Sequence, residues 1–254
     1  MLNFKNKLAF VLGGSGLIGN MVINKLEKLG CKTLNLDIKK PIKLRYDYLK
    51  FNCTKIKEIR NYSQITNKYG VPDIFINCAY PKTKDWDKNN FEKVKFISLK
   101  ENIENQLITS SFLIKEVAEK NRKKKKKCSI ILLNSIYGLV GQDKSIYKGT
   151  NVYENISYSI TKGALSNLTK QMCSHYSKYG IRVNNVCPGG VLDLKSKKKS
   201  KIYNKLLRNY SRRCPMGRMA TPEEIADPII FLASDNANYI SGISLIVDGG
   251  WTSI

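Results

Sequence analysis

The sequence predicts an α/β fold in which helices cover both faces of one parallel, doubly wound sheet, in a single domain spanning residues 1–254. Segments with strand and helix patterns alternate along the whole chain, and no linker or repeat interrupts them. Several strands are continuous apolar runs, as expected when both faces of a parallel sheet are buried. With 254 residues, of which 42% are hydrophobic, the chain can bury one core of this size.

The predicted strands are short apolar runs that end at glycine, proline or another turn residue. The first runs directly into Gly13 and Gly14, and the clearest is the apolar run CSIILLN at residues 128–134. We predict strands at residues 7–12, 32–37, 73–77, 128–134, 181–187 and 244–247.

The predicted helices carry apolar residues at every third or fourth position and end at glycine or before a turn. In the first helix, Leu17, Met21, Val22 and Leu26 share one face, and Gly30 ends the helix. We predict helices at residues 17–29, 56–69, 91–120, 155–179 and 222–233, with a break near the middle of the third, and a basic helical segment at residues 195–213.

A glycine-rich turn, GGSGLIG at residues 13–19, joins the first strand to the first helix. Gly13 allows a tight turn, Gly16 lets backbone N–H groups approach a pyrophosphate, and Gly19 lets the helix pack closely on the sheet. The helix N-terminus then faces the negative charge. A strand before the motif and a helix after it favour a dinucleotide-binding loop over an ordinary turn. We expect the dinucleotide to contact Gly13, Ser15, Gly16, Leu17, Ile18 and Gly19.

An acidic residue, Asp37, ends the second predicted strand. A carboxylate there accepts hydrogen bonds from the adenosine ribose hydroxyls and repels a 2′-phosphate, which favours NAD over NADP as the cofactor. Lys39 and Lys40 partly offset that repulsion, and the alternative is that Asp37 only begins a turn. Since strand ends line the ligand crevice of a parallel sheet, Asn77 and Ala79 are also expected to contact the cofactor.

Tyr158 and Lys162 lie four residues apart in a predicted helix, and Ser135 follows the strand before that helix. Residues with this spacing share a helix face, so the lysine ammonium is expected to lower the pKa of the phenol from its usual value of about 10. Tyr158 can then take a proton from an alcohol while hydride leaves the same carbon, with Ser135 bonded to the substrate oxygen. Lys162 is also expected to hold the nicotinamide ribose. The alternative is an unrelated Tyr and Lys pair on a solvated face.

The net charge is +24, from 44 Lys and Arg residues against 20 Asp and Glu residues. A nucleic-acid partner would account for this charge. Most of the basic residues are Lys, however, and specific recognition of phosphate and bases relies on Arg. We therefore expect no nucleic-acid partner and attribute the charge to residue usage, with RKKKKK at residues 122–127 as a solvated loop.

Seven cysteines are scattered through the chain without CxxC spacing, which argues against a disulfide framework and against a metal site. No apolar run reaches the length of a membrane span, and the run after the N-terminus is too short for a secretory signal. We expect a cytoplasmic protein with no membrane partner and no bound metal.

These motifs, in this order, resemble the short-chain dehydrogenase/reductase family over essentially the whole chain. The segments that carry the resemblance are GGSGLIG, NCAY, NSIYG, YSITK, IRVNNVCPGG, RMATPEEIA and SGISLIVDGGW. The resemblance implies a Rossmann-type sheet of about seven strands and a homotetramer or homodimer. The site residues that it implies are Ser135, Tyr158 and Lys162 for catalysis, Pro188, Gly189 and Val191 beside the nicotinamide, and Asn52 and Cys53 beside the adenine.

Some positions depart from the family pattern. Leu12 and Leu17 replace a threonine and a glycine of the usual glycine motif. The family's asparagine in the long helix aligns best with Leu107, although Asn102 and Asn105 lie nearby. A proton relay through that helix is therefore not predicted.

An insertion separates Ser135 from Tyr158, and with NCAYP and PGGVLD it resembles a subgroup linked to bacterial surface-sugar biosynthesis, including flagellin-glycan pathways. Residues 194–213 are expected to cover the substrate crevice and to order over bound substrate as a lid. Their basic side chains suit an anionic sugar, phosphorylated or nucleotide-linked, or else only reflect the lysine bias. If the charge is functional, removing Arg212 and Arg213 should raise KM.

Two other functions fit the sequence. A 3-oxoacyl-carrier-protein reductase has an acidic protein partner that would suit a basic surface, but Asp37 and the insertion argue against it. A non-catalytic NAD-binding subunit of another enzyme would not require Ser135, Tyr158 and Lys162 together. The sequence therefore predicts an oxidoreductase that interconverts a secondary alcohol and a ketone on a small-molecule substrate.

Overall fold

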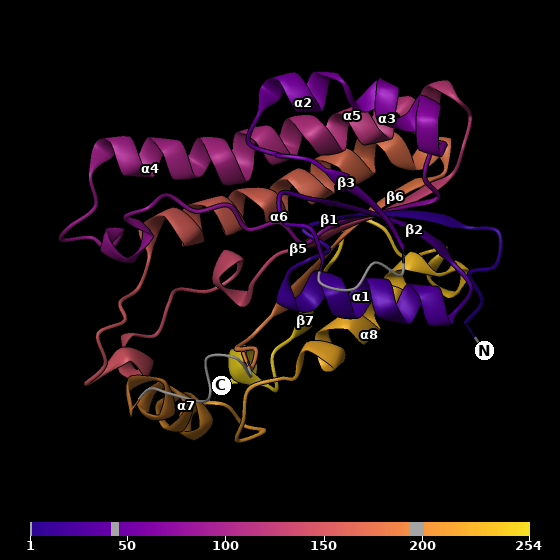
Figure 1. Ribbon diagram of the computed structural model, residues 1–254. Coiled ribbons are helices and arrows are strands. Elements are labelled where there is room, and N and C mark those ends of the chain that lie inside the picture. The colour runs from indigo at the N-terminus through magenta and orange to yellow at the C-terminus, as the bar shows by residue number, and fades with distance from the viewer. Residues whose placement is uncertain (1, 42–45, 194–200) are drawn as a thin grey trace.

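The computed structural model describes residues 2–41, 46–193 and 201–254. Seven strands, all paired in parallel, form one sheet in the order β3-β2-β1-β4-β5-β6-β7 (Figure 1). The predicted doubly wound sheet is therefore confirmed. The strands are β1 (Leu8–Leu12), β2 (Lys32–Asp37), β3 (Asp47–Lys50), β4 (Ile74–Asn77), β5 (Cys128–Leu133), β6 (Ile181–Pro188) and β7 (Ser244–Val247).

Helices cover both faces of this sheet (Figure 1). On one face, α1 (Leu17–Lys28) packs beside α8 (Pro222–Ala233). On the other face lie α5 (Thr109–Lys123) and α6 (Ile156–Tyr176), and α4 (Phe96–Ile103) leads into α5. No helix in the described ranges is both long and apolar enough to cross a membrane.

Alternate residues of the central strands supply two separate cores, one on each face. In β1, Phe10 faces the core shared with α5, whereas Val11 faces the core shared with α1 and α8. In β4 the neighbours Phe75 and Ile76 divide in the same way. This is the two-residue period of a strand, and it explains why these strands read as continuous apolar runs.

Three elements differ from the sequence prediction. β3 was not predicted, because its residues DYLK at an edge of the sheet are half-buried or exposed and carry no apolar run. The helix predicted at residues 56–69 is two helices, α2 (Ile56–Arg60) and α3 (Tyr62–Tyr69), joined at Asn61. The long helix predicted at 91–120 begins at Phe96 and ends at Lys123. The break predicted near its middle is present, since a π-helical turn (Glu104–Ile108) separates α4 from α5.

The insertion before Tyr158 folds against α7 (Lys201–Arg213), which lies beyond the carboxyl ends of the strands (Figure 1). The insertion contains a 3-10 turn at Lys144–Tyr147. Asn209 of α7 donates from Nδ2 to the carbonyl oxygens of Ile146 and Lys148, both at 3.0 Å. The base of the insertion is closed by Gln142, whose Nε2 donates to the Asn155 carbonyl at 2.8 Å. α7 is therefore held by the insertion.

Candidate active site

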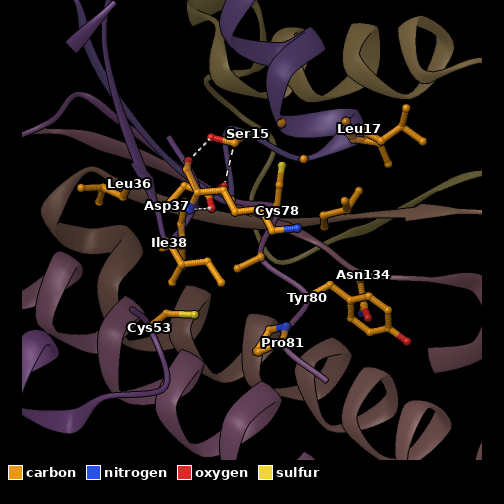
Figure 2. Close-up of a pocket in the computed structure, with 18 of the residues that line it drawn as sticks. Ser15, Leu17, Leu36, Asp37, Ile38, Cys53, Cys78, Tyr80, Pro81 and Asn134 are labelled. Atoms are coloured by element: carbon orange, nitrogen blue, oxygen red, sulfur yellow. Dashed lines mark hydrogen bonds between the residues drawn. The ribbon is translucent and has the colours of Figure 1, made fainter. Parts of the chain in front are cut away.

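A cavity of about 530 Å³ opens at the carboxyl ends of the central strands (Figure 2). It extends from Asp37 and Ile38 at one end to Tyr80 and Asn134 at the other. The structure brings together around it all of the predicted cofactor residues except Asn77, namely Gly13, Ser15, Gly16, Leu17, Ile18, Gly19, Asp37, Asn52, Cys53, Ala79, Tyr158, Lys162, Pro188, Gly189 and Val191. Asn77 lies just behind the wall, where its Oδ1 accepts from the Ala79 N–H at 3.1 Å.

The glycine loop leaves space at the start of α1. Gly13 has a φ of +75°, and a Cβ there would come within 2.7 Å of the Ala79 nitrogen, so only glycine fits. Gly16 caps α1 without a side-chain hydrogen bond to its first N–H groups. Unpaired N–H groups at a helix N-terminus suit a phosphate. These residues fit the pyrophosphate of a dinucleotide.

Asp37 anchors the loop at the end of β2. Its Oδ2 accepts from the Ser15 N–H at 3.0 Å and its Oδ1 from the Lys39 N–H at 2.9 Å (Figure 2). The Ser15 hydroxyl in turn donates to the Lys39 carbonyl at 2.7 Å. Since an ionised carboxylate has about four acceptor positions, two remain for ribose hydroxyls. Nearby, burial raises the pKa of the Cys53 thiol to about 11, so this side chain contributes no charge to the cavity.

Lys162 lies beneath two aromatic rings. Its Nζ donates to the Leu133 carbonyl at 2.8 Å and lies 5.5 Å from the centre of the Tyr158 ring and 5.8 Å from that of Tyr80. The side chain is 6% exposed. Because burial disfavours a charge, it lowers the pKa of Lys162 to about 8.

The pKa of Tyr158 is raised and not lowered, contrary to the sequence prediction. Desolvation by the surrounding protein has the largest effect, and the Ser135 hydroxyl opposes it through a hydrogen bond. The prediction is wrong because burial of the phenol outweighs the groups that favour its charged form. Ser135 itself does not line the main cavity. It lies two residues after the end of β5, where it caps the 3-10 turn Ile136–Gly138 by accepting from the Tyr137 N–H at 3.2 Å.

Sequence reasoning missed Gln106. This side chain is 5% exposed, and its Oε1 and Nε2 have no partner among the described residues. It borders a second cavity of about 10 Å³, which Lys162, Asn77 and Ser110 also line. Such a volume suits one water molecule. Leu107, the position suggested by alignment, packs instead against the core.

Gln106 could not be predicted from the helical period, because it lies in the π-helical turn, whose extra residue shifts the side chains that border the small cavity beside Lys162. The nearby asparagines have other surroundings. Asn102 is fully buried and bonds Thr83 through both its Oδ1 and its Nδ2. Further residues of the cavity wall adjoin predicted ones along the chain: Leu36, Ile38, Lys39, Phe51, Thr54, Cys78, Tyr80, Pro81, Leu133 and Asn134.

The basic segment at residues 194–213 is described from Lys201 onward, and residues 194–200 lie outside the described residues. Arg213 already has partners within the protein. Its Nε donates to Asp143 at 3.2 Å, and its other nitrogens donate to the carbonyls of Trp251 and Ile254. Arg213 is therefore not a suitable residue for testing substrate charge. Among the described residues, no three His, Cys, Asp or Glu side chains are placed to share a metal ion.

Comparison with known proteins agrees with this geometry. A family model described as enoyl-(acyl carrier protein) reductase matches residues 27–252. Post-translational flagellin modification protein A of Campylobacter coli is 28% identical over 97% of this chain and 98% of that protein. A 3-oxoacyl-[acyl-carrier-protein] reductase of Rickettsia typhi is 30% identical over 98% of each chain.

A solved structure with a bound cofactor has the same architecture. The short-chain dehydrogenase of Leptospira borgpetersenii, crystallised with NAD+, superposes with a TM-score of 0.87 at 29% identity, covering 98% of this chain and 94% of that one. The sheet, the family match and these relatives together show that the chain belongs to the short-chain dehydrogenase/reductase family, as an oxidoreductase that acts on CH–OH groups with NAD or NADP as acceptor.

Proposed function

We propose that Tyr158 is the acid and base of this oxidoreductase, with Ser135 and Lys162 as its catalytic partners. The observation that carries the proposal is one continuous cavity that joins the glycine loop and Asp37 to Tyr158 and Lys162. A nicotinamide dinucleotide, when bound, supplies the hydride acceptor or donor. The chain then has to position an alcohol carbon beside it and move one proton.

The residues divide this work between them. In alcohol oxidation Tyr158 acts as the phenolate and takes the hydroxyl proton, becoming the neutral phenol. In ketone reduction the neutral phenol, the form that its raised pKa favours, gives that proton to the substrate oxygen. Ser135, which is hydrogen-bonded to Tyr158, also bonds the substrate oxygen and holds it in line. Lys162 keeps an ammonium beneath the phenol and reaches toward the nicotinamide ribose.

The substitution Tyr158→Phe tests this assignment. It removes the phenol oxygen and keeps the ring and its packing. Since general acid–base catalysis contributes about 10²–10⁴-fold, we expect kcat to fall by that order while NADH binding, measured by fluorescence titration, stays unchanged. Wild-type turnover by Tyr158→Phe would show that another group moves the proton.

We propose NAD rather than NADP as the cofactor. Asp37 ends β2 with its carboxylate at the cavity, where it would repel a 2′-phosphate. Titration with NADH and NADPH should give a lower KM for NADH. In Asp37→Asn, which keeps the acceptor for the Ser15 N–H, the preference should shrink by about fivefold or more, since two unit charges about 4 Å apart interact by about 1 kcal/mol even in bulk water. An unchanged ratio would locate the selectivity elsewhere.

The substrate that we propose is an anionic sugar, phosphorylated or nucleotide-linked. Two observations support it: similarity to a flagellin modification protein, and the exposed Arg208 and Arg212 on α7 at the carboxyl edge of the sheet. A screen of sugar phosphates and nucleotide sugars with NAD, followed by NADH absorbance, tests this class. Replacing Arg208 and Arg212 by Ala should raise KM for a charged substrate and leave KM for a neutral one unchanged.

A second candidate is a 3-oxoacyl-carrier-protein reductase. The similarity to the Rickettsia typhi enzyme over nearly the whole chain supports it. Assays with a 3-oxoacyl carrier-protein thioester and either reduced dinucleotide separate the two candidates. Turnover of the thioester alone would favour this second function over sugar oxidation.

We also propose that residues 1–254 act as one domain and assemble into a homo-oligomer. Apolar side chains stay exposed at the start of α4, where Phe96 is 82% and Ile97 55% exposed, and Phe91 before it is 69% exposed. Burial of such side chains against a second copy would stabilise a dimer or tetramer. Light scattering coupled to size exclusion measures the assembly.

A further inference from the structure

Three aromatic side chains surround Tyr158, and we call Tyr80, Trp86 and Tyr137 the aromatic wall. Their ring centres lie 5.5, 6.2 and 6.4 Å from the centre of the Tyr158 ring, each in an edge-to-face arrangement. Tyr80 and Trp86 also contact each other at 5.3 Å. The proposed mechanism uses none of the three.

The wall comes from three separate parts of the chain. Tyr80 follows β4, Trp86 lies in the connection from β4 to α4, and Tyr137 follows β5, two residues after Ser135. Its position relative to Tyr158 therefore depends on how these connections are tied to α6.

Asn155, the N-cap of α6, ties Trp86 to the catalytic helix. Its Oδ1 accepts from the Tyr158 N–H at 3.0 Å, and its Nδ2 donates to the Trp86 carbonyl at 2.9 Å. One side chain thus fixes the backbone of both residues. Asn89 adds a second tie, since its Oδ1 accepts from Ser157 Oγ at 2.7 Å and its carbonyl accepts from the Ile156 N–H at 2.9 Å.

The connection that carries Trp86 is also bonded to α4. Ser98 donates to Asp85 at 2.8 Å, and Asn102 bonds Thr83 through Oδ1 at 3.1 Å and through Nδ2 at 2.9 Å. Ser98 and Asn102 are buried. Buried polar groups that satisfy one another rigidify a structure, so the wall is preformed.

Tyr80 lines the cavity beside Tyr158, whereas Trp86 and Tyr137 pack around the Tyr158 ring outside the residues that line the cavity. To exchange its proton with Tyr158, an alcohol oxygen lies within about 2.6–3.2 Å of the phenol oxygen. The atoms next to the reacting carbon then lie beside Tyr80 and near the rings that pack around Tyr158. Aromatic faces attract the slightly positive hydrogens of C–H groups, and an edge-to-face set offers such faces in more than one direction.

We propose that the aromatic wall selects substrates whose reacting alcohol lies on a saturated ring, such as a pyranose, over open-chain secondary alcohols. The inference rests on the proposed function and deepens it. A rigid ring presents several C–H groups at once and loses little conformational freedom against a preformed surface, whereas an open chain loses more. The phenol hydroxyls of Tyr80 and Tyr137 would also find partners on a polyol and none on an alkyl chain.

The test compares cyclohexanol with hexan-2-ol, two secondary alcohols of the same carbon number that differ in ring closure. Both are assayed with NAD on the full-length wild type and on Trp86→Leu, Trp86→Phe and Tyr239→Leu. We expect wild-type kcat/KM to favour cyclohexanol by tenfold or more. Trp86→Leu should reduce that ratio about tenfold, which is the effect of about 1.4 kcal/mol, and Trp86→Phe should keep most of it.

Tyr239→Leu is the matched control, because it also removes a ring but from a fully exposed position outside the site. Its ratio should equal that of the wild type. Thermal melting of each variant establishes that it is folded. If Trp86→Leu keeps the wild-type ratio, or if the wild type shows no preference for the ring, the aromatic wall does not select the substrate.

Ligand binding separates this inference from the proposed function. The chain has two tryptophans, Trp86 in the wall and the buried Trp251. A ligand-induced change in tryptophan fluorescence that is lost in Trp86→Phe therefore comes from Trp86 and reports on the wall. Cyclohexanol should change the fluorescence of the NAD complex at a lower concentration than hexan-2-ol. Equal responses overturn the inference. If neither alcohol is oxidised but the binding difference is intact, the inference stands, and the proposed function is contradicted only if the sugar phosphates and nucleotide sugars are not oxidised either.

Discussion

At the scale of single residues, Lys162 shows how burial tunes a catalytic group. Its ammonium keeps one protein acceptor, the Leu133 carbonyl, and burial lowers its pKa to about 8 from 10.5. The unfolded chain therefore binds more protons than the folded one between about pH 8 and 10.5, so this residue makes stability rise with pH in that window.

Comparison with Lys162→Met isolates that contribution, because every other titrating group is common to both proteins. At pH 7 the variant should be more stable by up to about 3 kcal/mol, and the difference should shrink as the pH rises from 8 toward 10.5. Urea denaturation across this pH range measures it. A difference that is constant with pH would mean that Lys162 titrates normally in the folded protein.

Gln106 offers a second prediction at this scale. Its unpartnered amide and the water-sized cavity beside Lys162 indicate that it positions a water on the ammonium. Gln106→Leu should lower kcat about tenfold and shift the pH profile of kcat, with KM for NADH unchanged. Stability should not fall, since the substitution removes buried polar atoms that lack partners.

Gln106→Asn keeps the amide and should recover part of the activity. If Gln106→Leu has the wild-type pH profile, the amide has only a packing role. The spacing of Tyr158 and Lys162 was enough to predict that they lie side by side, because residues four apart share one face of a helix. The regular helical period does not predict where the Gln106 side chain lies, because its position depends on the extra residue in the π-helical turn.

At the scale of elements, the start of α6 is a junction, because one residue there joins the helix to the connection that carries Trp86 and to the insertion. Asn155 caps α6, holds the Trp86 carbonyl and closes the insertion through Gln142. Asn155→Ala should lower the free energy of unfolding by about 1–2 kcal/mol, the usual effect of losing an N-cap. Chemical denaturation measures the loss, and wild-type stability in Asn155→Ala would contradict the role of the cap.

Asn155→Asp separates the two functions of the junction. Aspartate is also a good N-cap, so stability should largely return. It cannot donate to the Trp86 carbonyl, so the preference for cyclohexanol should stay weakened.

Most elements could be predicted from period and turn residues, and the limits of α8 and β7 agree with the structure. The edge strand β3 could not, because its side chains are partly exposed and carry no apolar pattern. The fold of the insertion also escaped prediction, because tertiary contacts with α7 hold it.

At the scale of the whole molecule, the net charge of +24 opposes folding through self-repulsion. Added salt screens that repulsion, since the Debye length falls from about 30 Å at 0.01 M to about 8 Å at 0.15 M. Between these ionic strengths we expect stability to rise by about 1 kcal/mol, which corresponds to a Tm increase of about 2–4 °C. Thermal melting in NaCl measures it, and sucrose at equal osmolality is the uncharged control. A Tm that falls with NaCl would show that attractive ion pairs outweigh the repulsion.

The order of the strands follows from the alternation of elements, but the position of α7 does not. That helix contacts the insertion through Asn209 and the Pro188-Gly189-Gly190 turn through Tyr210, whose hydroxyl accepts from the Gly190 N–H at 2.7 Å. The position of α7 is thus set partly by a loop that the sheet does not need. Lengthening or shortening residues 148–153 should therefore move α7 and leave in place the residues that line the cavity, none of which belongs to that loop or to α7.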